Sequence, residues 1–262
     1  MSPPSLPEFE RPPVTEVAIG LQFAPIQGLR QPHIGLFWSR LRSRFPTVAD
    51  QHPLPHLPLV AALPQPFQIQ FSQQSYPLPR TWLISEDGTQ LVQLQADRLV
   101  FNWRGEGVKY PRYDTLRPLF ESVLGDFQAF LAEEGLDPTV PEQIELAYVN
   151  TIVAEHLSAV LDGLNVPSLE PSGVLDQEHL VMSQRISSGD NAAVLLVQAQ
   201  SRQGPDQDQV LLTLTFRADV VDDQGGSAAS MRALFDQARE SIVRSFAKIT
   251  HPDLRAGWGE KT

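Results

Sequence analysis

The sequence predicts an α+β protein in which a curved antiparallel sheet carries long helices on one face. Alternating stretches are joined by connections too short for parallel neighbours, as at the Asp87-Gly88 turn. Two long stretches, 114–134 and 227–249, place apolar residues at helical spacing, and each follows a group of strands. Leu119-Phe120-Glu121 in the first also resembles Leu234-Phe235-Asp236 in the second. We therefore expect two halves, each a meander followed by a long helix, that arose by duplication.

The chain divides into an arm and two halves. Residues 1–15 are rich in proline and are expected to form an extended N-terminal arm. Residues 16–153 form the first predicted half and residues 154–262 the second, and the two are expected to pack into one compact unit.

The first half is predicted to open with a strand at 16–23, because apolar residues alternate there. A helix follows from near Pro32, a favoured first-turn residue, to Pro46. Residues 46–66 contain six prolines, which favours a connector with little regular structure. The other predicted elements are strands at 67–71, 80–85, 89–95 and 98–104, the helix at 114–134 and a strand at 143–153.

The second half follows a simpler plan. A short helix near 156–163 and a loose stretch rich in Pro, Ser and Gly precede three predicted strands. The last helix has Leu234, Phe235, Ala238 and Ile242 among its regularly spaced apolar residues. The strands are predicted at 178–187, 192–200 and 209–221, and the helix at 227–249.

Composition excludes several classes of protein. The net charge of −11 argues against direct nucleic-acid binding. The absence of cysteine excludes disulfides, thiolate metal sites and cysteine nucleophiles. The first residues lack the basic and apolar regions of a signal peptide, and no apolar run approaches the roughly 18 residues of a membrane helix. We expect a cytoplasmic protein that does not enter membranes.

The charge is unevenly distributed along the chain. Residues 118–178 contain twelve acidic residues and no basic one, whereas residues 11–117 contain eleven basic and seven acidic residues, a net +4. One interpretation is a docking surface for a basic protein partner, and the alternative is a set of solvated helix faces. The candidate partner-binding residues are Glu121, Asp126, Glu133 and Glu134.

The sequence contains none of the common catalytic motifs that we sought. GxxxxGK[ST] and GxSxG are absent, and Gly105-Glu106-Gly107 lacks the third glycine of a dinucleotide loop. His52 and His56 are separated by prolines that prevent the helix needed to aim both at one metal ion. We therefore predict no catalytic residue, no metal and no cofactor.

A polar strand face and the loop after it form the candidate ligand site. In an extended 98–104 stretch, Leu99, Phe101 and Trp103 point to the core, and the arginines and asparagine point to the other side. Arginines beside aromatic residues suit phosphate, carboxylate or nucleotide recognition, although nearby acids are an alternative partner for them. The candidates are Arg98, Asn102, Arg104, Lys109, Tyr110, Arg112, Tyr113 and Asn150. For Asn150 the alternative role is a structural tie to the loop at 110–113.

Several short motifs occur in the order expected of one prokaryotic family. They include Pro13-Val14-x-Glu16-Val17, Asn102-Trp103-Arg104, Tyr110-Pro111-x-Tyr113 and Tyr148-Val149-Asn150-x-Ile152. Over nearly its whole length the chain resembles a sporadically distributed family of similar-length proteins with no assigned function. Relatives often carry histidine where this chain has Arg239, so no catalytic role is transferred to that position. The resemblance implies a single-module fold and an association with mobile defence or toxin–antitoxin loci.

Two functions follow as expectations. The first is a non-enzymatic interaction or accessory protein, antitoxin-like or part of a mobile defence system, that uses the acidic surface. The alternative is a small-molecule or nucleotide sensor whose cleft is lined by Arg98, Asn102 and Arg104 and takes a small anionic ligand. An enzyme is less expected, because no spacing favours a pair of catalytic groups.

Overall fold

The computed structural model describes residues 5–56, 59, 78–105, 107–162, 179–188, 191–203, 207–220 and 227–261. The strand predicted at 67–71 and residues 1–4 of the arm lie outside these ranges. The helices are α1 (Gln31–Leu41), α2 (Tyr113–Glu133), the 3₁₀ helix η1 (Leu157–Ala159), α3 (Ala228–Ile249) and α4 (Pro252–Gly257). The strands are β1 (Glu8–Phe9), β2 (Val14–Phe23), β3 (Thr47–Gln51), β4 (Arg80–Ile84), β5 (Gln90–Gln95), β6 (Arg98–Arg104), β7 (Pro141–Val153), β8 (His179–Ser188), β9 (Asn191–Arg202), β10 (Gln209–Asp219) and β11 (Glu260–Lys261).

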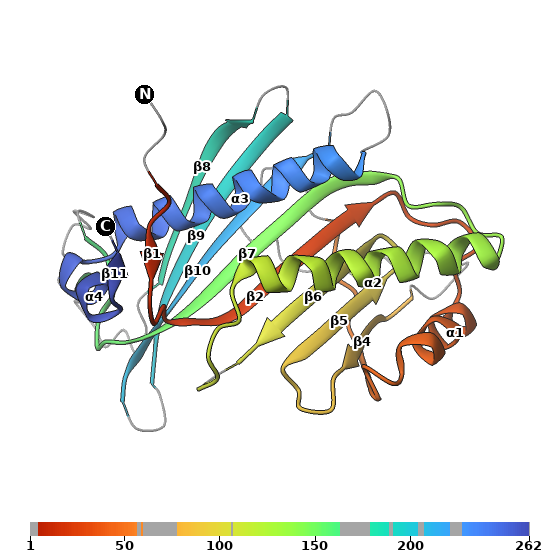
Figure 1. The fold of residues 1–262 in the computed structure, drawn as a ribbon, viewed down its shortest axis with the longest axis horizontal. Coiled ribbons are helices and arrows are strands. Elements are labelled where there is room, and N and C mark those ends of the chain that lie inside the picture. Colours follow the sequence, from red (N-terminus) through yellow and green to blue (C-terminus); the bar gives the residue numbers. More distant parts are fainter. Residues whose placement is uncertain are drawn as a thin grey trace.

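Nine of the described strands form one antiparallel sheet, which confirms the predicted α+β class (Figure 1). Their order is β3-β4-β5-β6-β2-β7-β10-β9-β8. The short turns at 86–88 and 96–97 join β4, β5 and β6 into the predicted meander, and β8, β9 and β10 form the second.

The two halves share one strand order. β2 pairs with β6, the last strand of the first meander, and β7 pairs with β10, the last strand of the second. The pairing of β2 with β7 then joins the halves into one sheet. By this topology β7 opens the second half, although residues 143–153 are assigned to the first half in the sequence analysis.

The long helices α2 and α3 run antiparallel across the same face of the sheet (Figure 1). Where they meet, the rings of Phe120 and Phe235 contact each other with centroids 5.5 Å apart. Two ion pairs flank this ring contact in the same way. On each helix, the arginine three residues before the phenylalanine pairs with the acidic residue that directly follows the phenylalanine of the other helix. The two pairs are Arg117–Asp236 at 3.2 Å and Arg232–Glu121 at 2.9 Å. The same ion pair is thus made once in each direction between the helices. Two copies of one helix related by a two-fold axis would make this pattern.

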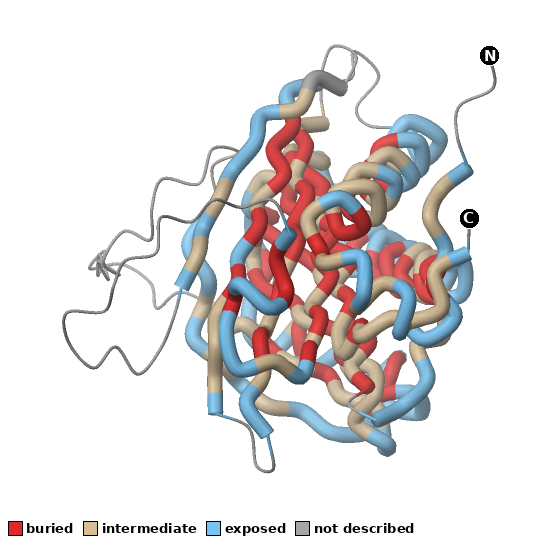
Figure 2. Tube along the Cα trace, turned by 90° about the vertical axis from the view of Figure 1, so that its left-hand side faces the viewer, coloured by how far each residue is buried: buried red, intermediate tan, exposed pale blue. Residues whose placement is uncertain are grey.

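The main core lies between the sheet and these helices, and buried residues concentrate there (Figure 2). Leu99 and Phe101 are fully buried and Trp103 nearly so, as predicted for that face of the strand. α1 packs beside α2 through Phe37, whose ring contacts Phe127 and Phe130. None of the described helices is long and apolar enough to cross a membrane.

The structure differs from the predicted elements in two places. Residues 47–51 form β3 at the sheet edge, within the stretch predicted to lack regular structure. All six prolines of that stretch lie outside the strand, one just before it at 46 and five at 53 or beyond, and β3 has no apolar alternation to reveal it. The described part of the arm contains no helix, and its residues 8–9 pair with 260–261 as the two-stranded sheet β1–β11. This pairing joins two distant parts of the chain and leaves no local pattern in the sequence.

Candidate functional site

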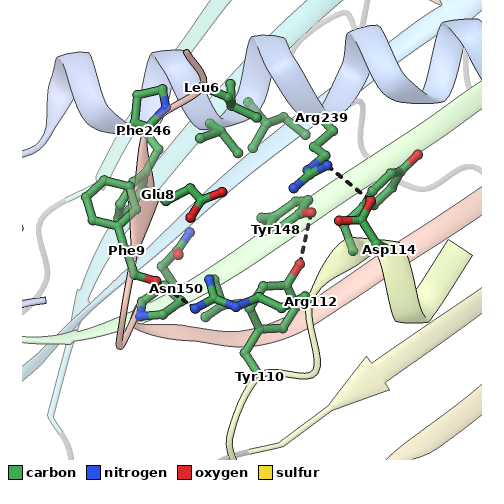
Figure 3. A pocket seen from close by; sticks show the side chains of 16 residues that line it. Leu6, Glu8, Phe9, Tyr110, Arg112, Asp114, Tyr148, Asn150, Arg239 and Phe246 are labelled. Carbon is green, nitrogen blue, oxygen red and sulfur yellow. Dashed lines mark hydrogen bonds and ion pairs between the residues drawn. The ribbon is translucent and has the colours of Figure 1, made fainter. Parts of the chain in front are cut away.

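A cavity of about 320 Å³ lies on the helix side of the sheet, between the N-terminal arm, the start of α2, α3 and β7 (Figure 3). Tyr148 and Asn150 of β7 form its floor, because alternate residues of a strand share a face. α3 contributes Arg239 beside an apolar run that ends at Phe246. The loop before α2 contributes Tyr110 and Arg112, and α2 itself begins with Tyr113. The cavity thus has a polar end and an apolar end.

Two tyrosines form the polar end. The hydroxyl of Tyr110 donates a hydrogen bond to the hydroxyl of Tyr148 at 3.1 Å (Figure 3). Burial raises the pKa of Tyr110 to about 12 and raises the pKa of Tyr148 well above that of an exposed phenol. Both hydroxyls are therefore protonated at neutral pH. The Tyr148 hydroxyl proton has no acceptor among the described residues, so it is available to a ligand.

Arg239 brings a positive charge to the same end. Its guanidinium donates to the carboxylate of Asp114 at 3.2 Å and lies over the ring of Tyr113, 5.2 Å from the centroid. Burial, and then the neighbouring carboxylate of Asp236, raise the pKa of Tyr113. Asp114 takes one of the five N–H groups of Arg239, so the guanidinium can still donate to a carboxylate in the cavity.

Arg112 connects the cavity wall to the arm. Its guanidinium donates to the carbonyl oxygens of Phe9 at 2.8 Å and Glu10 at 3.3 Å. Arg112 has φ 77° and ψ 150°, and it alone among the described non-glycine residues has a positive φ. Such a conformation costs about 1–3 kcal/mol, and strain of this kind concentrates at functional sites. The backbone at Arg112 therefore has a conformation that a residue with a side chain does not favour by itself.

We predict that Arg112→Gly is more stable than Arg112→Ala by about 1–2 kcal/mol. Both variants lose the bonds to the arm, but only glycine adopts the positive φ without strain. Urea denaturation of the two variants measures the difference. Equal stabilities, or a more stable alanine variant, would show that the backbone at Arg112 is not strained.

The arm closes one side of the cavity. Phe9 packs edge-on against Phe246 and Trp258, at 5.6 and 6.3 Å between centroids. The backbone of residues 10 and 11 donates to the carbonyls of 259 and 258. Glu8, next to this anchor, extends its carboxylate into the cavity above Asn150 (Figure 3).

Asn150 has a different partner from the one expected. Its amide donates to the backbone carbonyl of Leu212 on β10 at 3.1 Å, and it does not tie down the loop at 110–113. Tyr148 makes that contact instead, through Tyr110. Asn150 is 2% exposed and lines the cavity, and its Oδ1 accepts no bond within the described part of the chain.

Arg98, Asn102 and Arg104 lie on the opposite face of the sheet from this cavity, because they alternate with Leu99, Phe101 and Trp103. Arg98 is buried and bonds to Asp97, to Gln22 at 3.0 Å and to the carbonyl of Pro55 at 2.7 Å. These contacts make it part of a structural network.

Asn102 and Arg104 are likewise committed to neighbours. Asn102 is buried between Gln93 and Glu16, bonding to them at 2.7 and 2.6 Å. Burial raises the pKa of Glu16, although the bond from Asn102 and the charge of Arg104 oppose this rise. Arg104 lies over the ring of Trp82 and borders a shallow groove with Glu16. The three predicted residues therefore do not line a common cleft in the described structure.

The remaining predicted residues divide between the cavity and the surface. Tyr110, Arg112, Tyr113 and Asn150 line the cavity, whereas Lys109 is exposed in the loop and does not. The sequence analysis did not select Arg239 and Glu8 as site residues. Arg239 is one of several arginines on a long helix, and Glu8 lies in an arm without periodicity, so no local signal marks either.

Most of the acidic candidates pair with arginines of α1, of α3 or of the turn after α1. Glu121 pairs with Arg232, and Asp126 with Arg44 at 3.3 Å. Glu133 and Arg40 form a bidentate pair at 3.1 and 2.5 Å. Glu134 is exposed at the end of α2. Three of the four candidates therefore already have a positively charged partner within the molecule.

The fold and the cavity together define a class: a two-half α+β protein with an amphipathic cavity beneath its N-terminal arm. Comparisons of the chain with protein-family models, curated proteins and solved structures gave no match. Within the described ranges, no three His, Asp or Glu side chains group closely enough to hold a metal ion.

Proposed function

We propose that this protein is a binding module for a small organic anion with an apolar body. The observation that supports this function is the convergence of Arg239 and the protonated Tyr148 hydroxyl at one end of a 320 Å³ cavity. The volume lies at the lower end of the roughly 300–1,000 Å³ of small-molecule sites. The proposal keeps the predicted anionic ligand but moves its site from the face of Arg98 to the opposite face of the sheet.

The chemistry of the walls supports a carboxylate head group. A guanidinium and a phenolic hydroxyl both donate to carboxylate oxygens, and such charge-assisted bonds are about twice as strong as neutral ones. The pKa of Tyr148 is well above neutrality, so its hydroxyl remains a donor beside the anion. Away from this end, Ile242, Val243 and Phe246 present apolar surface to the body of the ligand.

The predicted interaction or accessory role is a weaker proposal. Glu121, Asp126 and Glu133 already have arginine partners, so a basic protein would have to compete with these ion pairs. A role in defence or as an antitoxin, a basic protein partner and a cytoplasmic location stay predictions from the sequence. Co-purification with the product of the neighbouring gene, with and without charge reversal at Glu133 and Glu134, tests them.

We predict that Arg239→Ala weakens binding of 3-phenylpropanoate about 10- to 100-fold. The loss of a hydrogen bond to a charged group corresponds to about 1.5–3 kcal/mol, which gives this range. Isothermal titration calorimetry measures the affinity. The matched control is Arg244→Ala, which removes an arginine of the same helix that pairs with Glu240 outside the cavity. Equal loss in both variants, or no binding to the unmodified protein, would reject the site.

A further inference from the structure

We infer that the natural ligand is a zwitterion, an apolar α-amino acid or a close relative, whose ammonium group is recognised by Glu8 and Asn150. This inference rests on the proposed function, because it concerns the same cavity. It adds a second charged group to the ligand and assigns that group a location.

Two acceptors at the cavity have no partner in the described part of the chain. The Glu8 carboxylate points into the cavity, and it has no hydrogen-bond or ion-pair partner among the described residues (Figure 3). Directly below it, the Oδ1 atom of buried Asn150 accepts no bond from the described part of the chain. An anion alone would leave both acceptors unused and would be repelled by Glu8. An ammonium group has three donors and no acceptor, so it satisfies both.

The acceptors that have no partner lie on a different side of the cavity from Arg239. Glu8 and Asn150 lie toward the arm, where the Arg112 guanidinium already donates to the backbone carbonyls of residues 9 and 10. Arg239, which is paired with Asp114, and Tyr148 lie toward the start of α2 (Figure 3). A ligand that places its carboxylate at Arg239 therefore presents neighbouring atoms to Glu8. Opposite charges on adjacent carbons, as in an α-amino acid, match this separation of charges in a small cavity.

The remaining wall suits an apolar side chain. Leu6 of the arm and Ile242, Val243 and Phe246 of α3 all line the cavity, and none of these four carries a polar side-chain atom. Surface of this kind favours a leucine- or phenylalanine-like group through burial of apolar area. The three parts of the lining thus correspond to the three groups of an apolar amino acid.

The arm makes recognition of the amine separable from recognition of the acid. Glu8 belongs to β1, whereas Arg239 belongs to α3. A substitution of either residue therefore leaves the element that carries the other residue unaltered. Glu10 lies on the same arm, two residues further along, and does not line the cavity. Glu10→Gln is therefore the matched control for Glu8→Gln.

The test compares ligands that differ only in the amine. Isothermal titration calorimetry measures the affinities of L-phenylalanine and 3-phenylpropanoate, and of L-leucine and 4-methylpentanoate. Each ligand is titrated into the full chain and into its Glu8→Gln and Glu10→Gln variants. We expect the amino acids to bind about tenfold more tightly than the amine-free acids. Glu8→Gln should remove this preference and tighten the amine-free acids, and Glu10→Gln should change neither affinity.

Two outcomes separate the inference from the proposed function. Binding of the amine-free acids at equal or higher affinity, with no change of preference in Glu8→Gln, would overturn the zwitterion and leave the anion site standing. Binding of neither class would reject the anion site as well. A thermal melt of Glu8→Gln verifies its folding, which we expect to be unchanged because Glu8 is exposed.

Discussion

Replacing Arg98 with methionine is expected to destabilise the protein by about 3–5 kcal/mol, the usual cost of removing one partner of a buried ion pair. The side chains of Arg98 and Asp97 are only 6% and 9% exposed. Without the guanidinium, the Asp97 carboxylate keeps its burial and its contacts with Gln95 and His56 but loses the arginine at 3.4 Å. Gln22 Oε1 and the Pro55 carbonyl oxygen lose the hydrogen bonds from Arg98 as well. Urea denaturation measures the change in the free energy of unfolding.

Arg185→Met is the control for this experiment. Arg185 is exposed on β8, and surface substitutions of this kind change stability by about 0.5 kcal/mol or less. We also expect Arg98→Met to bind 3-phenylpropanoate as the unmodified protein does, at temperatures where both are folded. A stable variant that no longer binds would instead restore Arg98 to the site predicted from the sequence.

Phe127→Ala is expected to cost a similar 3–5 kcal/mol, because it removes a large side chain from a closely packed core. Phe127 is fully buried, and its ring contacts Phe23, Phe37 and Phe130 at centroid distances from 5.1 to 6.5 Å. These partners come from β2, α1 and α2, so the variant weakens the contact between three elements. Thermal or urea unfolding measures the loss.

A graded series makes this result specific. Phe127→Leu retains part of the volume and should lose less stability than Phe127→Ala, whereas Gln128→Ala, at the next and exposed position, should be nearly neutral. Phe127 does not line the cavity, so the affinity of the folded protein for its ligand should not change. A neutral Phe127→Ala would mean that this region is not part of the cooperative core.

The strands and helices were predictable wherever one side is buried. β6 shows why: Leu99, Phe101 and Trp103 alternate with polar residues, and burial of one face imposes that period. The same holds for α2 and α3, where the apolar stripe indicates the side that faces the sheet. β3 and the β1–β11 pair lie at edges, so burial leaves little pattern in their sequences.

The candidate site was predictable only in part, for a reason that β6 also illustrates. Arg98 and Tyr110 are twelve residues apart and share a basic, aromatic stretch, yet the sheet separates them to opposite faces. A cluster in sequence remains a cluster in space only if the backbone keeps its members on one side. Neither the count nor the spacing of arginines contains that information.

By itself the sequence determined the sheet's local pairing, the two-half plan and the types of residue available for a site. The tertiary structure alone decided which of them meet. Arg239 reaches Tyr148 because α3 crosses the sheet above β7, and Glu8 reaches Asn150 because β11 holds the arm beside α3. Short-range periodicity arises from burial of one face, whereas these two juxtapositions join residues 91 and 142 positions apart, which only the packing of the whole chain brings together.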